Sequence, residues 1–165
     1  MDLGLAGKRA AVAASSAGLG FAAARALAQE GARVVMCGRD PGRLADAVAQ
    51  VDGAVGITAD VAGIEGARGF VAQAAEVLGG LDVLVPNAGG PPPGTFASTP
   101  PEAYVPALEL NLLSTVAMCH AAVPAMCEQG WGRVVAITSV TVRQPAPSLI
   151  LSNTARAGVT GFLKT

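Results

Sequence analysis

Several short polar segments of the chain contain residue types that can bind a phosphorylated ligand. In "AASSAGLG", Gly18 and Gly20 supply two of the three glycines of a dinucleotide-binding turn, and Ala14 stands in the place of the first. Ser15 and Ser16 add two hydroxyl groups that can reach a phosphate. This segment alone is compatible with a phosphate-binding turn and with a simple tight turn.

The segment "CGRD" indicates which dinucleotide such a turn would bind. A site that prefers NAD has a carboxylate about 20 residues after the glycine turn, where it accepts hydrogen bonds from the ribose. This chain has Gly38 and Arg39 there, and a guanidinium suits a 2′-phosphate. We therefore expect NADP(H) to be favoured over NAD(H). The alternative is that Arg39 is a solvated loop residue and that Asp40 caps the following helix.

Two more polar segments follow predicted strands. Asp60 in "TADV" can accept a hydrogen bond from an adenine amino group. Asn87, Ala88 and Gly89 form a turn that a flat ligand can approach closely, because Gly89 has no side chain. Either segment alone is typical of ordinary turns. Polar or glycine-rich segments after four successive strands together predict a nucleotide site.

The elements that must position these residues alternate along the chain. Short β-rich segments predict strands over residues 8–14, 32–38, 54–60, 81–87 and 132–139. Alanine-rich segments predict helices over residues 18–29, 41–51, 66–78 and 107–126. Because parallel strands need crossover helices, this order predicts an α/β, Rossmann-like fold, a doubly wound parallel sheet in three α/β/α layers. Ligands of such sheets bind beyond the carboxyl ends of the strands.

Composition limits the size and the partners of the protein. We expect residues 1–165 to form a single dinucleotide-binding domain. A net charge of −1 without a basic run argues against nucleic acid or a membrane surface as the partner. With 52% apolar and only 14% charged residues, some apolar surface is expected to meet another chain. Three cysteines without metal or redox spacing indicate reduced thiols and a cytoplasmic location.

Together these motifs resemble the short-chain dehydrogenase/reductase family, close to its 3-oxoacyl-carrier-protein reductase branch. The resemblance extends from about Leu5 to the last residue, and the order and spacing of the motifs are more specific than any one of them. It is carried by the segments "SSAGLG", "CGRD", "ADV", "NAGGPPPGTF", "LNLLS", "GRVVAITSV" and "RAGVTGFLKT". Because this family transfers a hydride between a nicotinamide and a carbonyl or alcohol, the resemblance implies an oxidoreductase with a small-molecule substrate.

The resemblance also implies which residues contact the cofactor. In this family the glycine turn wraps the pyrophosphate, and the ends of the next three strands hold the 2′-phosphate, the adenine and the neighbouring ribose. The corresponding residues here are Gly18, Leu19 and Gly20 for the pyrophosphate, Arg39 for the 2′-phosphate, Asp60 and Val61 for the adenine, and Asn87 to Gly89 for the ribose.

Of the four side chains that assist hydride transfer in this family, two have counterparts in the chain. Asn111 matches the asparagine that holds a proton-relay water, and Ser139 matches the serine that orients the substrate oxygen. The positions of the family's tyrosine and lysine fall on Ser152 and Arg156, four residues apart on one helical face. The single tyrosine, Tyr104, and the two lysines lie elsewhere, so the usual proton-transfer pair is absent.

The replacement of this pair leaves two functions open. An alkyl hydroxyl is a much weaker acid than a phenol, and a guanidinium stays protonated, although it can stabilise a developing alkoxide. The first hypothesis is an NADP(H)-dependent, 3-oxoacyl reductase-like oxidoreductase with a non-standard proton-transfer site, in which Ser152 holds a water and Arg156 supplies positive charge. The second is an inactive NADP(H)-binding protein that serves as a sensor or a structural subunit.

Family members continue beyond the part of the fold that this sequence covers. By resemblance we expect a C-terminally truncated Rossmann domain that lacks the last strands. We also expect a homodimer or homotetramer, formed through the long fourth crossover helix and the helix after the fifth strand.

Overall fold

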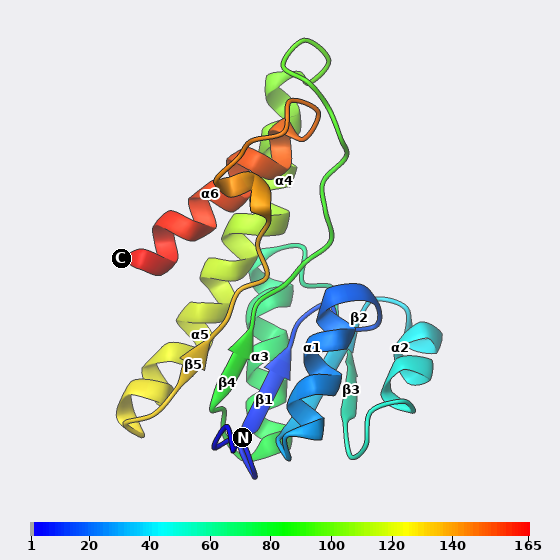
Figure 1. Cartoon of the computed structure of the whole chain (residues 1–165), viewed down its shortest axis with the longest axis vertical. Helices are drawn as coiled ribbons and strands as arrows, with labels where there is room; N and C mark the ends of the chain where they lie inside the picture. The colour runs from blue at the N-terminus through cyan, green and yellow to red at the C-terminus, as the bar shows by residue number, and fades with distance from the viewer. Residues whose placement is uncertain (1) are drawn as a thin grey trace.

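The computed structural model describes residues 2–165 and confirms the expected α/β fold, with helices on both faces of a parallel five-stranded sheet (Figure 1). The strands are β1 (Arg9–Val12), β2 (Arg33–Gly38), β3 (Val55–Thr58), β4 (Val83–Val85) and β5 (Arg133–Val134). The main helices are α1 (Gly18–Gln29), α2 (Pro41–Val48), α3 (Ile64–Leu78), α5 (Ser114–Glu128) and α6 (Ile150–Lys164). Shorter helical segments are η1 (Pro101–Ala103), α4 (Tyr104–Leu108), η2 (Glu109–Leu113) and η3 (Val140–Val142).

The strand order is β3-β2-β1-β4-β5, so the winding direction reverses between β1 and β4. In an open parallel sheet this reversal leaves a crevice at the carboxyl ends of the two central strands. The segments that follow β1 and β4 diverge there, one into α1 and the other into the long connection to α4 (Figure 1). The predicted phosphate-binding turn therefore lies at the point where the fold leaves room for a ligand.

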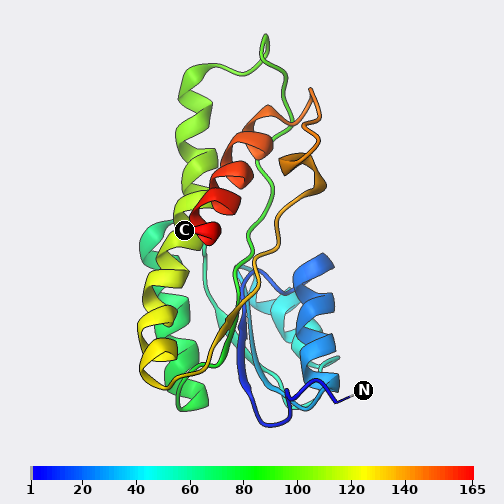
Figure 2. The ribbon, with the colours of Figure 1, turned by 60° about the vertical axis from the view of Figure 1, so that its left-hand side comes forward.

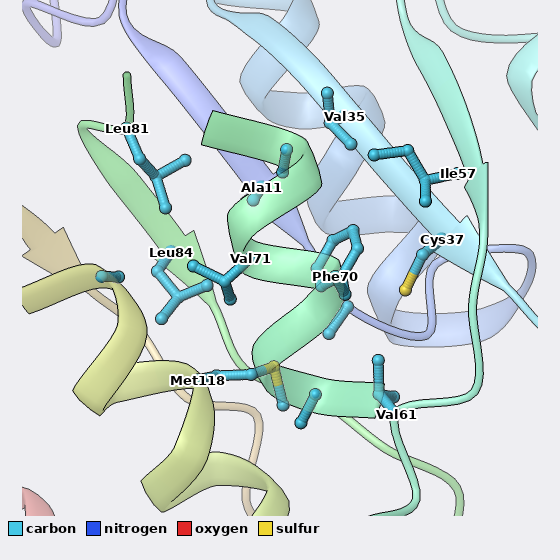
Figure 3. Packing of buried hydrophobic residues seen from close by; sticks show 14 of the residues in the cluster. Ala11, Val35, Cys37, Ile57, Val61, Phe70, Val71, Leu81, Leu84 and Met118 are labelled. Carbon is cyan, nitrogen blue, oxygen red and sulfur yellow. The ribbon is translucent and has the colours of Figure 1, made fainter. Parts of the chain in front are cut away.

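Alternation along β1 divides the interior into two cores. Ala10 and Val12 pack in the cluster that α1 and α2 cover, whereas Ala11 packs in the cluster that α3 and α5 cover. Figure 2 shows these helix pairs on opposite faces of the sheet. In the second cluster, Phe70 of α3 is fully buried among residues of β1, β2 and β3, and Met118 of α5 closes the edge near β4 (Figure 3). Burial on both faces gives the central strands β1, β2 and β4 their largely continuous apolar sequence.

Strand β5 is shorter than the sequence predicts. A strand was expected over residues 132–139, but regular pairing ends at Val134. The chain continues beside β4, since the Ile137 N–H donates to the Pro86 carbonyl oxygen at 3.0 Å. Pro86 has no N–H with which to continue the ladder, so the strand pattern stops where β4 stops.

The apolar segment after the proline-rich loop is a core helix, as the sequence predicts. By length and composition the continuous helical segment Pro101–Glu128 could span a membrane, but 44% of its most apolar window is buried within the protein. Its α5 part packs along α3, and its η2 part packs against α6. Met118 and Ala122 on α5 are buried, so the apolar composition reflects packing against these helices.

A charged cluster joins the elements at the amino-terminal end of the sheet, away from the crevice. The Asp82 carboxylate accepts hydrogen bonds from Arg9 Nε at 2.8 Å, from Arg9 Nη2 at 2.7 Å and from the Arg9 backbone N–H at 2.9 Å. Gln129 Nε2 donates to the same carboxylate at 3.2 Å. The hydrogen bonds from Arg9 lower the pKa of Asp82 to about 2 from its usual 3.8.

This cluster predicts how stability depends on acid. Because the folded pKa of Asp82 is depressed, its stabilisation is complete above about pH 4 and is lost as the pH falls from 4 to 2. Asp82→Asn is expected to lower the free energy of unfolding by roughly 1.5–3 kcal/mol at pH 7, and by much less near pH 2. Urea denaturation at several pH values measures this, with the exposed Asp52→Asn as control. A loss that is equal at pH 7 and pH 2 would contradict the assignment.

Candidate functional site

A cavity of about 780 Å³ lies at the carboxyl ends of the strands, where the winding direction reverses. Its wall is formed by the turn after β1, by the ends of β2 and β3, and by the loop after β4. The lining residues are Ala14, Ser16, Ala17, Gly38, Arg39, Asp40, Pro41, Arg43, Ala59, Asp60, Val61, Ala62, Ala88, Gly89, Gly90 and Leu110. Residues predicted from four separate strand ends thus share one cavity.

The turn after β1 leads directly into α1. Ala14 has φ +44°, a left-handed conformation, and Gly18 has φ +60° with open space where a Cβ would lie. No side chain caps α1, so the N–H groups of its first turn have neither a capping side chain nor an acceptor within the helix. Gly18, Leu19 and Gly20 begin the helix directly after Ala17, which lines the cavity. A helix start of this kind is suited to an anion.

The end of β4 fixes this turn in place. Asn87 Nδ2 donates to the Ala14 carbonyl oxygen at 3.1 Å, and Asn87 does not line the cavity itself. Gly20 packs so closely beneath that a Cβ there would lie 2.5 Å from the Ala14 oxygen and 2.9 Å from Asn87 Nδ2. Asn87 is therefore a positioning residue for the turn, whereas Ala88 and Gly89 form the wall.

The two serines of the turn face in different directions. The Ser15 hydroxyl is fully buried, donates to the Val12 carbonyl oxygen at 2.8 Å and accepts from the Cys37 N–H at 3.0 Å. It joins β1 to β2 and is not available to a phosphate, which corrects the expectation for Ser15. The Ser16 hydroxyl lies 3.0 Å from where a Gly38 Cβ would be, on the cavity wall.

The conformation of Ala14 predicts a stabilising substitution. An alanine with positive φ pays a steric cost that glycine avoids, partly offset by the greater freedom of glycine in the unfolded chain. Ala14→Gly is therefore expected to raise the free energy of unfolding by about 0.5–1 kcal/mol. Urea denaturation tests this, and Gly18→Ala should shift stability in the opposite direction, because Gly18 also has positive φ. A lower free energy of unfolding for Ala14→Gly than for the parent would contradict the inference that Ala14 is strained.

Two guanidinium groups lie on the wall beyond the end of β2. Arg39 was predicted there, and Arg43, one turn into α2, was not; both side chains are exposed. Asp40 caps α2 by accepting from the Arg43 backbone N–H at 2.8 Å, as the alternative interpretation expected. The exposed Arg39 side chain also lines the cavity. Within residues 2–165, no carboxylate pairs with either guanidinium within 4.0 Å. Arg43 follows Arg39 by about one helical turn, and this spacing was the sequence signal that could have identified Arg43 as a second residue of the wall.

Asp60 and Val61 line the cavity from the loop directly after β3. One Asp60 oxygen accepts from the Ala62 N–H at 3.0 Å, and Val61 is 6% exposed beside it. This arrangement holds the loop after β3 against the cavity wall. The other carboxylate oxygen has no partner among the described residues and can accept from a ligand.

Asn111 lies in the π-helical segment η2, which interrupts the long helix. Its Nδ2 donates to the Gly89 carbonyl oxygen at 2.8 Å, which ties the helix to the loop after β4. Its Oδ1 is buried and has no hydrogen-bond partner in the described part of the chain. Such an orphaned acceptor needs a donor such as a water, and π-helical turns occur frequently at functional sites.

Ser139 precedes η3 in the segment after β5, Ser152 and Arg156 lie on α6, and none of the three is part of the wall of the 780 Å³ cavity. Ser139 Oγ is 2.9 Å from Thr141 Oγ1 and accepts from the Thr141 N–H at 3.2 Å. Arg156 Nη1 donates to the carbonyl oxygen of Ile137, two residues before Ser139, at 3.0 Å. Arg156 thus joins α6 to the segment that follows β5 and precedes Ser139.

The side chains at the two replaced positions contact each other. Arg156 Nε donates to Ser152 Oγ at 3.2 Å across one turn of α6. Both side chains are half-buried, and burial lowers the pKa of the Arg156 guanidinium, which nevertheless stays protonated at neutral pH. The pair therefore offers a fixed positive charge and a hydroxyl, but no group that titrates near neutrality.

A glycine turn and an open cavity at the reversal point of a β3-β2-β1-β4-β5 parallel sheet define a Rossmann-type dinucleotide-binding fold. A family model described as short chain dehydrogenase matches residues 8–165. The chain belongs to the short-chain dehydrogenase/reductase family.

Two curated dehydrogenases are similar to this chain in sequence. Human dehydrogenase/reductase SDR family member 4 is 36% identical over 166 residues, which cover 98% of this chain and 60% of that protein. L-rhamnose 1-dehydrogenase (NAD(P)(+)) of Azotobacter vinelandii is 38% identical over 143 residues, which cover 81% of this chain and 56% of that protein. The chain therefore spans less than two thirds of the length of these relatives.

Solved structures are similar over nearly the whole chain. L-sorbose reductase from Gluconobacter frateurii, complexed with NADPH and L-sorbose, has a TM-score of 0.91 and 31% identity, covering 98% of this chain and 64% of that one. A variant of actinorhodin polyketide ketoreductase with NADPH has a TM-score of 0.89 and 32% identity. This match covers 96% of this chain and 63% of the ketoreductase chain. Both similarities support the fold and the oxidoreductase family.

Proposed function

We propose that the chain binds NADP(H) in the cavity at the strand ends and belongs to a reductase of small carbonyl compounds. The residues present fit such a cofactor. The first turn of α1 has uncapped N–H groups, Gly18 and Gly89 leave open space for a close approach, and two guanidinium groups line the wall. The unpaired Arg39 and Arg43 at this wall are the observation that carries the proposal.

Preference for NADP(H) follows from the end of β2. Arg39 and Arg43 would bind the 2′-phosphate together with the Ser16 hydroxyl, which lies over Gly38. A carboxylate at position 38, as in an NAD site, would meet Ser16 and repel the phosphate. The first turn of α1 would hold the pyrophosphate, and the ends of β3 and β4 would hold the adenine and the ribose. Two of the similar structures contain NADPH, which agrees with this proposal.

The chemistry that the cofactor supplies when bound is hydride transfer to a carbonyl carbon or from an alcohol. Ser139 is proposed to orient the substrate oxygen. Asn111 Oδ1 is proposed to accept a hydrogen bond from a water that relays a proton from solvent. Arg156 supplies positive charge to the developing oxyanion. The proton then comes from water, because neither Ser152 nor Arg156 is an effective acid near pH 7.

Turnover tests the enzyme proposal. NADPH oxidation is followed with 3-oxoacyl esters, quinones and small ketones for the parent, Ser139→Ala and Arg156→Ala. The Ser139→Ala variant is expected to lose about 10²-fold in kcat/KM, because it removes a donor to the substrate oxygen. Equal rates for Ser139→Ala and the parent would exclude this site as the place of reaction.

The Ser152–Arg156 contact also favours a second function, a nucleotide-binding protein without turnover. At the positions of the family's tyrosine and lysine, a guanidinium donates to a serine hydroxyl. The usual acid is therefore absent, while the residues proposed to bind the nucleotide are present. NADPH binding without any substrate-dependent oxidation in the panel would establish this sensor or structural role.

Substrate branch, assembly and location are also proposals. We propose a 3-oxoacyl reductase-like substrate, a homodimer or homotetramer and a cytoplasmic protein. Exposed apolar side chains such as Val105, Val135 and Leu163 support assembly, and free cysteines support a reducing compartment. Analytical ultracentrifugation tests the assembly.

A further inference from the structure

The Ser152–Arg156 pair is rich in hydrogen-bond donors. A guanidinium has five N–H donors and no acceptor, and only two hydrogen bonds use them here, to Ser152 Oγ and to the Ile137 carbonyl oxygen. The remaining donors of the group include both hydrogens on Nη2. Because Ser152 Oγ accepts from the cation, its own O–H points elsewhere, and no acceptor within residues 2–165 takes it. The pair thus presents several unused donors and a positive charge.

Within residues 2–165, no carboxylate balances this charge. The described residues form ion pairs between Arg9 and Asp82 and between Arg68 and Glu65, and none involves Arg156. The guanidinium is half-buried, so water screens it less than it screens a surface arginine. A partly desolvated cation without a counter-ion strongly favours the arrival of an anion.

Helix α6, which carries the pair, lies beside the segments that carry the proposed substrate-orienting residues. Arg156 reaches from α6 to the backbone at the end of β5, two residues before Ser139. Helix α6 also packs against η2, which carries Asn111. The unused donors therefore lie on a helix that contacts both the segment before Ser139 and the segment that carries Asn111.

We propose that Ser152 and Arg156 form a binding site for a carboxylate group of the substrate. The planar, forked guanidinium matches the two oxygens of a carboxylate, and the Ser152 hydroxyl adds a third donor. This inference rests on the proposed function for the identity of the reacting group, and it names the substrate class as carbonyl compounds that carry a carboxylate. For such substrates the pair that replaces the family's acid serves recognition, and Arg156 binds the carboxylate in place of the oxyanion role described above.

Binding of matched neutral and anionic probes tests this site without turnover. Titrations of 4-fluorobenzoate and its neutral isostere 4-fluorobenzamide are followed by fluorine NMR at pH 7 and constant ionic strength, with and without NADPH. The carboxylate is expected to bind at least about tenfold more tightly than the amide. Arg156→Gln is expected to remove the difference, and Arg156→Lys to keep part of it, because a lysine retains the charge without the fork.

Controls keep the outcome interpretable. Ser152→Ala is expected to weaken carboxylate binding about two- to fivefold. This variant tests the site even if the Arg156 variants do not fold. Arg68→Gln, which removes an exposed guanidinium on α3, should leave binding unchanged. Equal affinity for the two probes, no binding of the carboxylate, or an unchanged preference in a folded Arg156→Gln variant would overturn the inference. Failure of NADPH to bind, with the probe preference intact, would instead overturn the proposed cofactor.

Discussion

The double variant Ser152→Tyr/Arg156→Lys is expected to reduce carbonyl substrates about 10²- to 10⁴-fold faster than the parent. A tyrosine phenol has an ordinary pKa near 10, and a neighbouring ammonium lowers it toward neutrality, whereas a serine hydroxyl remains a very weak acid. The two positions already contact each other across one turn of α6. The measurement is NADPH oxidation with 3-oxoacyl esters under saturating cofactor, over long incubations for the parent.

The pH profile and the single variants show whether the gain comes from the acid. The double variant should acquire a rate that depends on pH through a titrating phenol, while the parent rate should be flat between pH 6 and 9, because Arg156 does not titrate there. Ser152→Tyr alone should gain less, and Arg156→Lys alone should gain nothing. A double variant no faster than the parent, with unchanged NADPH affinity and fold, would show that the missing acid does not limit the reaction.

Loss of the guanidinium groups at the end of β2 is expected to have the second largest effect. Arg39→Ala should weaken NADPH binding by roughly 10- to 100-fold and change NADH binding less than about twofold, because only NADPH has the 2′-phosphate. Arg43→Ala should act in the same direction, and the double variant should lose the preference. Calorimetric titration with both nucleotides measures each affinity.

Two further variants sharpen this prediction. Gly38→Asp introduces a carboxylate whose Cβ would lie 3.0 Å from the Ser16 hydroxyl, so it should disfavour NADPH and favour NADH. Arg68→Ala removes an exposed arginine far from the cavity wall and should change neither affinity. If Arg39→Ala weakens NADPH and NADH equally, Arg39 does not bind the 2′-phosphate.

The fold was largely predictable because local patterns and topology agree. Alternating apolar strands and alanine-rich helices predict the parallel sheet, and α1 begins and ends where the sequence indicates, at Gly18 and Gln29. The end of β5 was not predictable from its own apolar residues. It depends on Pro86, directly after β4, which only the pairing of β4 with β5 brings beside the segment that follows Val134.

The wall of the cavity was predictable where a residue follows closely on a strand, as for Arg39, Asp60 and Gly89, and their contacts with a nucleotide stay predictions. The Ser15 hydroxyl was wrongly expected to face a phosphate, because two adjacent serines are equivalent in sequence and only the structure shows that this one donates to the Val12 carbonyl oxygen. Arg43 was missed because its approach to the cavity depends on the direction of α2. The tie between Asn111 and Gly89 depends on the π-helical turn, for which no sequence signal was available.

Calorimetric titration of the parent chain with NADPH and NADH tests the central claim most directly, namely that the cavity at the strand ends holds a 2′-phosphorylated dinucleotide. We expect heat of binding with NADPH at micromolar concentration and an affinity for NADH at least about tenfold lower. No heat with either nucleotide would contradict it, and so would equal affinity for both.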